Sequence, residues 1–251
     1  MEKPDLFHLR AIGAAYSRLP YENVTKILKD ARSTSSELKL RAAEEVLDDH
    51  LRWNTGGTCF SLCNALLEVL EFSGFHAFIG MADMHYGENI HCAVIAVLPE
   101  GRYLMDPGYL LNEPMLLPQN GAETVTETPM NVVILRSEGP DIVSLFTRES
   151  GQEKWRYRLR SWPVTRKEFR MHRIESFHLN SMEHVMLSLL DDSGRLYFRK
   201  DRLDYVNQTE RKKSKTQDSV ALSNLFGVPK DLIVLAQKAV LIRPERVKII
   251  L

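Results

Sequence analysis

The sequence has few cysteines and no long hydrophobic run. Its 251 residues include three cysteines, Cys59, Cys63 and Cys92. This small, odd number excludes a disulfide framework and favours free thiols in a reducing compartment. The N-terminal stretch "MEKPDLFHLR" also lacks the apolar core of a signal peptide, and nowhere do eighteen apolar residues follow one another. We therefore expect a cytoplasmic protein that does not span a membrane.

An excess of charge of one sign is absent as well. Lys and Arg together number 33, and so do Asp and Glu. No overall field would draw the chain onto nucleic acid or an anionic membrane, so we expect neither as a partner. The hydrophobic content of 44% is, by contrast, ample for a packed core.

The first third of the chain has the apolar spacing of helices. Residues 5–17 predict a short amphipathic helix, and a second follows Ser35 or Ser36 as the N-cap. A third begins near Cys59, and Gly74 stands where a C′ glycine would end it. The second helix would bury one apolar stripe, formed by Leu38, Ala42, Val46, Leu47 and Leu51.

The pattern then changes to that of short strands. The runs 76–84, 91–99 and 102–106 predict an antiparallel meander, with a hairpin at Pro99–Gly101 that brings His91 and Asp106 to the same end. Further strand-like runs are 131–136, 142–147 and 155–160, followed by a helical segment at 166–179, a hairpin about 192–194, and helices at 221–226 and 230–239. The sequence thus predicts an α+β protein of several parts.

The stretch "NTGGTCFSL" carries the chemical signal. A helix start and a nearby imidazole both stabilise a thiolate, so Cys59 at the helix start is a candidate nucleophile. Cys63, one turn further, falls in the apolar stripe and reads as core. His91 and Asp106 would supply the base and the carboxylate that orients it. From the residues alone, a purely structural cysteine remains an alternative.

A less favoured hypothesis is a metal site formed by Cys59, Cys63, His91 and Cys92. The spacing is not that of a zinc finger, and adjacent strand residues such as His91 and Cys92 point to opposite faces. We expect no metal.

At these residues the sequence resembles the arylamine N-acetyltransferases, whose signature is Arg-Gly-Gly-x-Cys followed by a histidine on a strand and an aspartate. The matching stretches are "TGGTCF", "IHCAVIAV" and "YLMDPGYL", and "LPYENV", "DPGYLLNEPMLLPQNG" and "LSNLFGVP" resemble further family segments in the same order. The resemblance implies a helical bundle over 1–75 that carries the nucleophile, a β-barrel-like domain over 76–165, and an α/β lid over 166–251.

The resemblance also implies an activity. Cys59 would take an acetyl group from acetyl-CoA as a thioester and pass it to an arylamine, an N-hydroxyarylamine or a hydrazine in a ping-pong reaction. His91 would hold Cys59 as the thiolate, and Asp106 would orient the imidazole. The acyl acceptor, the residues that bind the CoA nucleotide and the oligomeric state are not assigned by the sequence. The basic run 211–215 is typical of a solvated loop, with contact to the CoA phosphates as the less favoured alternative.

Three residues depart from the family pattern. Thr55 replaces the arginine before Gly-Gly, and Ser61 and Cys63 stand where the family has Glu and Asn. Glu22 would then lack its usual arginine, and Arg52 is the candidate replacement, since a buried unpaired carboxylate is costly. Two alternatives stay open: a transglutaminase-like thiol enzyme, either amide synthase or hydrolase, that does not use CoA, and a non-catalytic binding protein.

Overall fold

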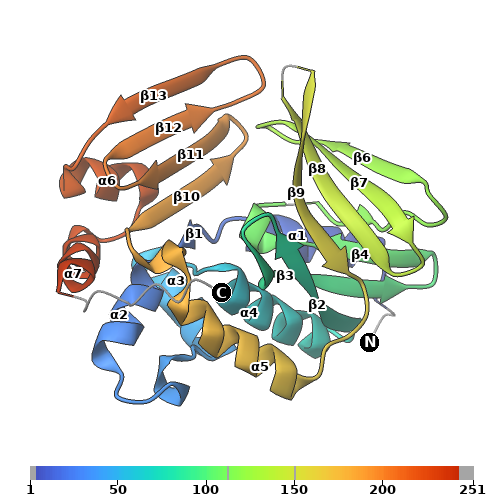
Figure 1. Cartoon of the computed structure of the whole chain (residues 1–251), viewed down its shortest axis with the longest axis horizontal. Coiled ribbons are helices and arrows are strands. Elements are labelled where there is room, and N and C mark those ends of the chain that lie inside the picture. The colour runs from blue at the N-terminus through green and yellow to red at the C-terminus, as the bar shows by residue number, and fades with distance from the viewer. Residues whose placement is uncertain (1–3, 112, 150, 243–251) are drawn as a thin grey trace.

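The computed structural model describes residues 4–111, 113–149 and 151–242. The N-terminal part is helical, as predicted (Figure 1). It contains a two-residue strand, β1 (Tyr21–Glu22), and α-helices, of which α2 has no counterpart in the sequence prediction. They are α1 (Leu6–Tyr16), α2 (Val24–Arg32), α3 (Ala43–Trp53) and α4 (Cys59–Phe72).

The start predicted for the second helix is wrong. Residues Glu37–Lys39 form a single 3-10 turn, η1, Leu40 is extended, and α3 begins only at Ala43. Leu38 and Leu51, expected to be buried, are 60% and 84% exposed. The reason is Arg41, which is 4% exposed and fills the interior beneath the turn, so a continuous helix from residue 36 would not place its side chain there.

Helix α4 matches its prediction. It begins at Cys59, and Gly74 follows its end with a φ of +83°, a conformation that glycine adopts without strain. The helix packs against strands β2 (His76–Met84) and β3 (Gly87–Leu98) through its apolar face.

Those two strands lie in the middle of a large antiparallel sheet. Its order is β5-β4-β3-β2-β9-β8-β7-β6, and it curls into a nearly closed barrel (Figure 1). The predicted hairpin at Pro99–Gly101 joins β3 to β4, with Leu98 opposite Gly101. The other strands are β4 (Gly101–Met105), β5 (Met115–Leu116), β6 (Glu123–Glu127), β7 (Val132–Gly139), β8 (Ile142–Glu149) and β9 (Gln152–Arg160).

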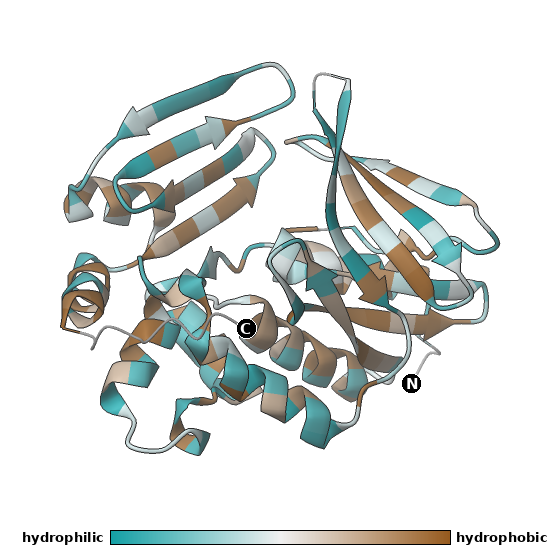
Figure 2. Ribbon diagram, viewed as in Figure 1, coloured by the Kyte–Doolittle hydropathy of each residue, from teal (hydrophilic) through white to brown (hydrophobic). Residues whose placement is uncertain are grey.

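A second antiparallel sheet has the order β1-β10-β11-β12-β13, so the N-terminal strand β1 joins strands from the last third of the chain. The basic run 211–215, expected to be a loop, is instead the edge strand β13, and all five of its residues are exposed. Figure 2 shows this strand as largely hydrophilic. Charged residues on an edge strand discourage further pairing. The strands are β10 (Met186–Asp191), β11 (Gly194–Arg199), β12 (Arg202–Val206) and β13 (Arg211–Lys215).

Three helices lie in the last third of the chain: α5 (Arg166–Glu175), α6 (Ser219–Phe226) and α7 (Lys230–Leu241). Short 3-10 turns, η3 (Ser176–His178) and η4 (Asn180–Met182), join α5 to β10. The apolar side chains of α6 and α7 form one core with α2 and one face of the sheet. Within the described residues, none of the helices is both long and apolar enough to cross a membrane.

The molecule is therefore a mixed α/β fold with a helical N-terminal part, a barrel-like sheet and a smaller sheet with helices, which confirms the predicted fold class. The proposed boundaries at 75 and 165 stay predictions. The start of α4 lies where these parts meet, because Glu22 of β1 hydrogen-bonds Gly57, two residues before Cys59, and Gly108 after β4 contacts Cys59 itself.

Candidate active site

Cys59 is the first residue of α4 and is 6% exposed. Thr58 occupies the N-cap position, but its side chain makes no capping hydrogen bond. A Cβ added to Gly108 would lie 2.6 Å from the Cys59 Cβ and 3.0 Å from the His91 Cε1. Gly108 therefore touches both side chains, and only a residue without a side chain lets the segment after Asp106 approach so closely.

His91 and Asp106 lie together, as predicted. His91 Nε2 is 2.8 Å from Asp106 Oδ2, and the two side chains are 6% and 0% exposed. The hairpin of β3 and β4 brings them together, although β3 begins at Gly87, so His91 lies within the strand rather than at its start. The backbone N–H of Tyr109 donates to Asp106 Oδ1 at 2.9 Å, which fixes the other carboxylate oxygen.

Tyr157, on β9, is part of this site and was not found from the sequence. Its hydroxyl donates to Asp106 Oδ2 at 2.7 Å, and its ring centroid lies 4.8 Å from that of His91. The side chain is fully buried. The contact joins residues 51 positions apart through the pairing of β9 with β2, and no local motif marks it.

Burial and the neighbouring groups change the pKa of the His91 imidazole in opposite directions. Burial favours neutral His91, but the Asp106 carboxylate and the Cys59 contact outweigh it and raise the pKa of His91 to about 10. A hydrogen bond with Cys92, together with burial, raises the pKa of Cys59, whereas His91 lowers it. The second thiol and burial thus oppose the thiolate form of Cys59, and the imidazole of His91 favours it.

The other two cysteines are core residues. Cys63 and Cys92 are both 0% exposed, and the Cys63 thiol donates to the Cys92 carbonyl at 3.3 Å. Cys92 faces α4, while His91 faces Tyr157 in the barrel, so the two point to opposite sides of β3 as expected. Within the described ranges, no group of three metal-ligating side chains comes together.

Phe60 lines a small cavity beside α4 that is partly open to solvent. The cavity also contacts Lys26, Arg41 and Arg173, and it does not include Cys59. Phe60 is itself 3% exposed and packs against Phe169 of α5. Phe60, the residue after the candidate nucleophile, is therefore a core residue that packs against α5.

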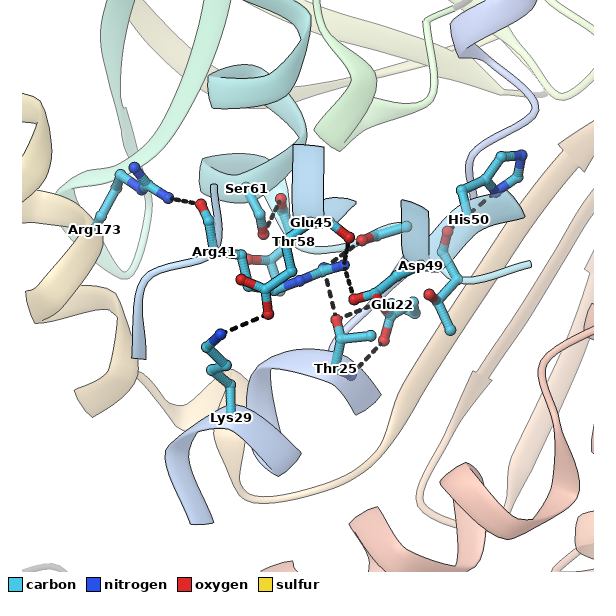
Figure 3. Close-up of polar contacts among 12 residues, drawn as sticks. Glu22, Thr25, Lys29, Arg41, Glu45, Asp49, His50, Thr58, Ser61 and Arg173 are labelled. Atoms are coloured by element: carbon cyan, nitrogen blue, oxygen red, sulfur yellow. Dashed lines mark hydrogen bonds and ion pairs between the residues drawn. The ribbon is translucent and has the colours of Figure 1, made fainter. Parts of the chain in front are cut away.

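Arg41, not Arg52, supplies the cation near Glu22. Arg52 is exposed, so its predicted role is wrong. Arg41 is buried, and its charge opposes the rise that burial causes in the pKa of Glu22. Both side chains meet at Thr25, which donates its backbone N–H and its hydroxyl to Glu22 and accepts from Arg41 Nη1 at 2.9 Å (Figure 3).

Comparison with known families agrees with this architecture. A sequence model described as N-acetyltransferase matches residues 5–232. The fold and the match define an acyl-transferring enzyme. Because the match covers nearly the whole chain, the chain belongs to the arylamine N-acetyltransferase family. No curated protein sequence matches it.

Solved structures of arylamine N-acetyltransferases share the fold. The enzyme of Mycobacterium marinum in complex with CoA is 19% identical, with a TM-score of 0.78 and 94% of each chain covered. That of Salmonella typhimurium is 19% identical, with a TM-score of 0.76, 95% of this chain and 93% of the other covered. The enzyme of Mycobacterium smegmatis is 22% identical, with a TM-score of 0.76 and coverage of 95% and 92%.

Proposed function

We propose that the protein transfers an acetyl group from acetyl-CoA to an arylamine, an N-hydroxyarylamine or a hydrazine, through a thioester on Cys59. The observation that carries this proposal is the convergence of Cys59 and His91 on Gly108, with Asp106 bonded to the imidazole, in a chain of this family. The Mycobacterium marinum relative in complex with CoA supports acetyl-CoA as the donor.

In the first half-reaction, the Cys59 sulfur gives up its proton and attacks the thioester carbonyl carbon of acetyl-CoA. Asp106 favours the imidazolium form of His91, so the proton of the Cys59 thiol already resides on the imidazole when the sulfur attacks. When the bond between the acetyl carbon and the CoA sulfur breaks, CoA leaves as a thiolate and takes the proton from His91. The products are acetyl-Cys59 and free CoA.

In the second half-reaction, the amine nitrogen attacks the acetyl carbon of the Cys59 thioester. His91, now neutral, accepts the proton that the nitrogen loses, and the Cys59 thiolate leaves. Tyr157 and Asp106 keep the imidazole in one orientation through both steps, since His91 and Tyr157 share the Asp106 Oδ2 oxygen.

The negative charge that develops on the acetyl oxygen needs donors. The first N–H groups of a helix lack partners within the helix, and Thr58 does not cap those of α4 with its side chain. The backbone N–H of Cys59 is therefore suited to stabilise this oxyanion, helped by the dipole at the helix start.

One face of the second sheet suits the phosphates of CoA. On β11, Leu196 and Phe198 pack into the apolar core, which leaves Arg195, Tyr197 and Arg199 on the opposite face. The Arg195 guanidinium lies 5.4 Å from the centroid of the Tyr197 ring.

Two groups of this face take part in the electrostatics of their surroundings. Burial lowers the pKa of Arg195, and the charges of Tyr109 and Glu149 oppose this change. Burial raises the pKa of Tyr86, and the charge of Arg199 opposes that rise. The neighbouring strands add Arg202, Arg211, Lys213 and Lys215 to the same face, together with Asp204, which forms an ion pair with Arg202. Phosphates placed here would leave the pantetheine arm directed toward Cys59.

Intact-protein mass spectrometry tests the proposal. The protein is mixed with acetyl-CoA in the absence of an acceptor, and Cys59→Ala and Cys63→Ala are compared. We expect one added acetyl group on the wild type and on Cys63→Ala, and none on Cys59→Ala. An adduct that survives Cys59→Ala would disprove the thioester at this residue. No adduct, with Cys59 still alkylated by iodoacetamide, would favour a transglutaminase-like enzyme that does not use CoA. An unreactive Cys59 would favour a non-catalytic protein.

A further inference from the structure

The segment that leads into α4 lacks the usual devices that fix a helix start. Thr58 makes no side-chain capping bond, and its Oγ1 has no hydrogen-bond partner among the described residues. Position 55, where the family signature has arginine, holds a fully buried Thr55 whose Oγ1 is also unpartnered in the described chain. Something else must hold residues 55–58 in place.

Arg41 reaches this segment from the loop before α3. Its Nη1 donates to the Gly56 carbonyl at 2.6 Å and to Thr25 Oγ1 at 2.9 Å (Figure 3). Its Nη2 forms an ion pair with Asp49 at 2.7 Å, and the Arg41 and Asp49 side chains are 3% and 16% exposed. The guanidinium thus bridges α2, α3 and the segment before Cys59, with a partner on each.

Two backbone bonds and the His50 ring, whose Nδ1 lies 3.0 Å from the Thr55 carbonyl oxygen, also support this segment. The Glu22 N–H donates to the Gly57 carbonyl at 3.0 Å, and the Gly57 N–H donates to the Pro20 carbonyl at 3.4 Å. A Cβ on Gly57 would lie 3.3 Å from Arg41 Nη1. Of these bonds, the one from Arg41 is charge-assisted and the shortest.

We propose that Arg41 is a positioning residue for Cys59, because it fixes the Gly-Gly segment that leads into α4. By fixing the Gly56 carbonyl, Arg41 sets the direction in which α4 starts, and so the position of the Cys59 sulfur relative to His91. The inference rests on Cys59 as the proposed nucleophile. It assigns the positioning of Cys59 to a residue 18 positions earlier in the chain, and no local sequence motif indicates this role.

The fork of the guanidinium matters as much as its charge. Asp49 and Gly56 bind different nitrogens of Arg41, and Thr25 shares Nη1. A lysine ammonium at this position carries the charge on a single nitrogen and does not span the same partners. Arg41→Lys therefore separates the geometric role from the electrostatic one.

The test measures the rate of iodoacetamide alkylation at Cys59 between pH 6 and 9, followed by peptide mass spectrometry, in Arg41→Lys and Arg41→Ala. Arg52→Ala is the matched control, since it removes an exposed arginine close by. We expect alkylation to slow at least tenfold in both Arg41 variants and to stay unchanged in the control. In turnover, kcat should fall while KM for acetyl-CoA is kept.

Chemical rescue separates positioning from a general loss of structure. Guanidinium chloride at millimolar concentration should restore part of the Cys59 reactivity in Arg41→Ala, whereas sodium chloride at equal ionic strength should not. If Arg41→Ala does not fold, Arg41→Lys carries the test. A folded Arg41→Lys that alkylates within twofold of the wild-type rate would overturn the proposal. Because alkylation needs no acetyl transfer, this outcome is distinct from failure of the proposed function.

Discussion

Tyr157→Phe tests the contact that links the barrel to the candidate site. The substitution removes one hydroxyl and leaves the ring that packs against His91. That hydroxyl donates to the fully buried Asp106, and a hydrogen bond to a charged group contributes about 1.5–3 kcal/mol. For a chain of this size the loss corresponds to a decrease in Tm of about 3–12 °C.

Tyr16→Phe is the matched control. Its hydroxyl is also buried and donates at the same distance, 2.7 Å, but to the uncharged Leu62 carbonyl. The expected cost is about 1 kcal/mol, or a decrease in Tm of about 2–4 °C. Thermal unfolding followed by circular dichroism compares the two variants.

The activity of the same variants gives a second readout. Asp106 keeps its bonds with His91 and Tyr109 in Tyr157→Phe, so acylation of Cys59 by acetyl-CoA should slow by about tenfold or less. Tyr16→Phe should leave this rate unchanged. A Tyr157→Phe variant as stable and as active as the wild type would refute the reasoning that this hydroxyl supports the carboxylate.

Two further predictions concern charge. The pKa of His91 is about 10 in the folded chain, above its ordinary value of 6.5, so its stabilising contribution is complete below about pH 6.5 and is lost as the pH rises to about 10. The urea concentration at the midpoint of unfolding should therefore decrease as the pH rises from 7 to 10, and it should decrease less in Asp106→Asn. A midpoint concentration that increases over this range contradicts the raised pKa. Arg199→Gln should increase KM for acetyl-CoA several-fold and leave that for p-nitrophenyl acetate, which has no phosphate, unchanged; equal increases for both donors would argue against phosphate binding by this face.

Local patterns explain which elements were predicted correctly. The helix from Cys59 to Gly74 has a continuous apolar stripe and a glycine stop, and the meander has alternating runs with a Pro99–Gly101 turn. Both signals lie within a few residues of the element they specify. The hairpin of this meander brings His91 and Asp106 together, so their proximity could also be predicted from the sequence.

The failures share a different cause. The second helix was expected to start near Ser36, but the burial of Arg41 decides where α3 begins, and its partners Thr25 and Gly56 lie outside the predicted helix. Likewise the run 211–215 has the composition of a solvated loop, yet it pairs with β12 because a sheet edge is available there. In both cases the deciding contact belongs to another part of the chain.

The sequence by itself determined the order of helices and strands, the free cysteines and the resemblance to a family, because periodicity, turn residues and motifs are local properties. Only the tertiary structure decided which arginine supports the Gly-Gly segment, that Tyr157 bonds Asp106, and that burial with Cys92 raises the pKa of Cys59. These depend on distance and desolvation between residues far apart in the chain, and a linear pattern carries neither quantity.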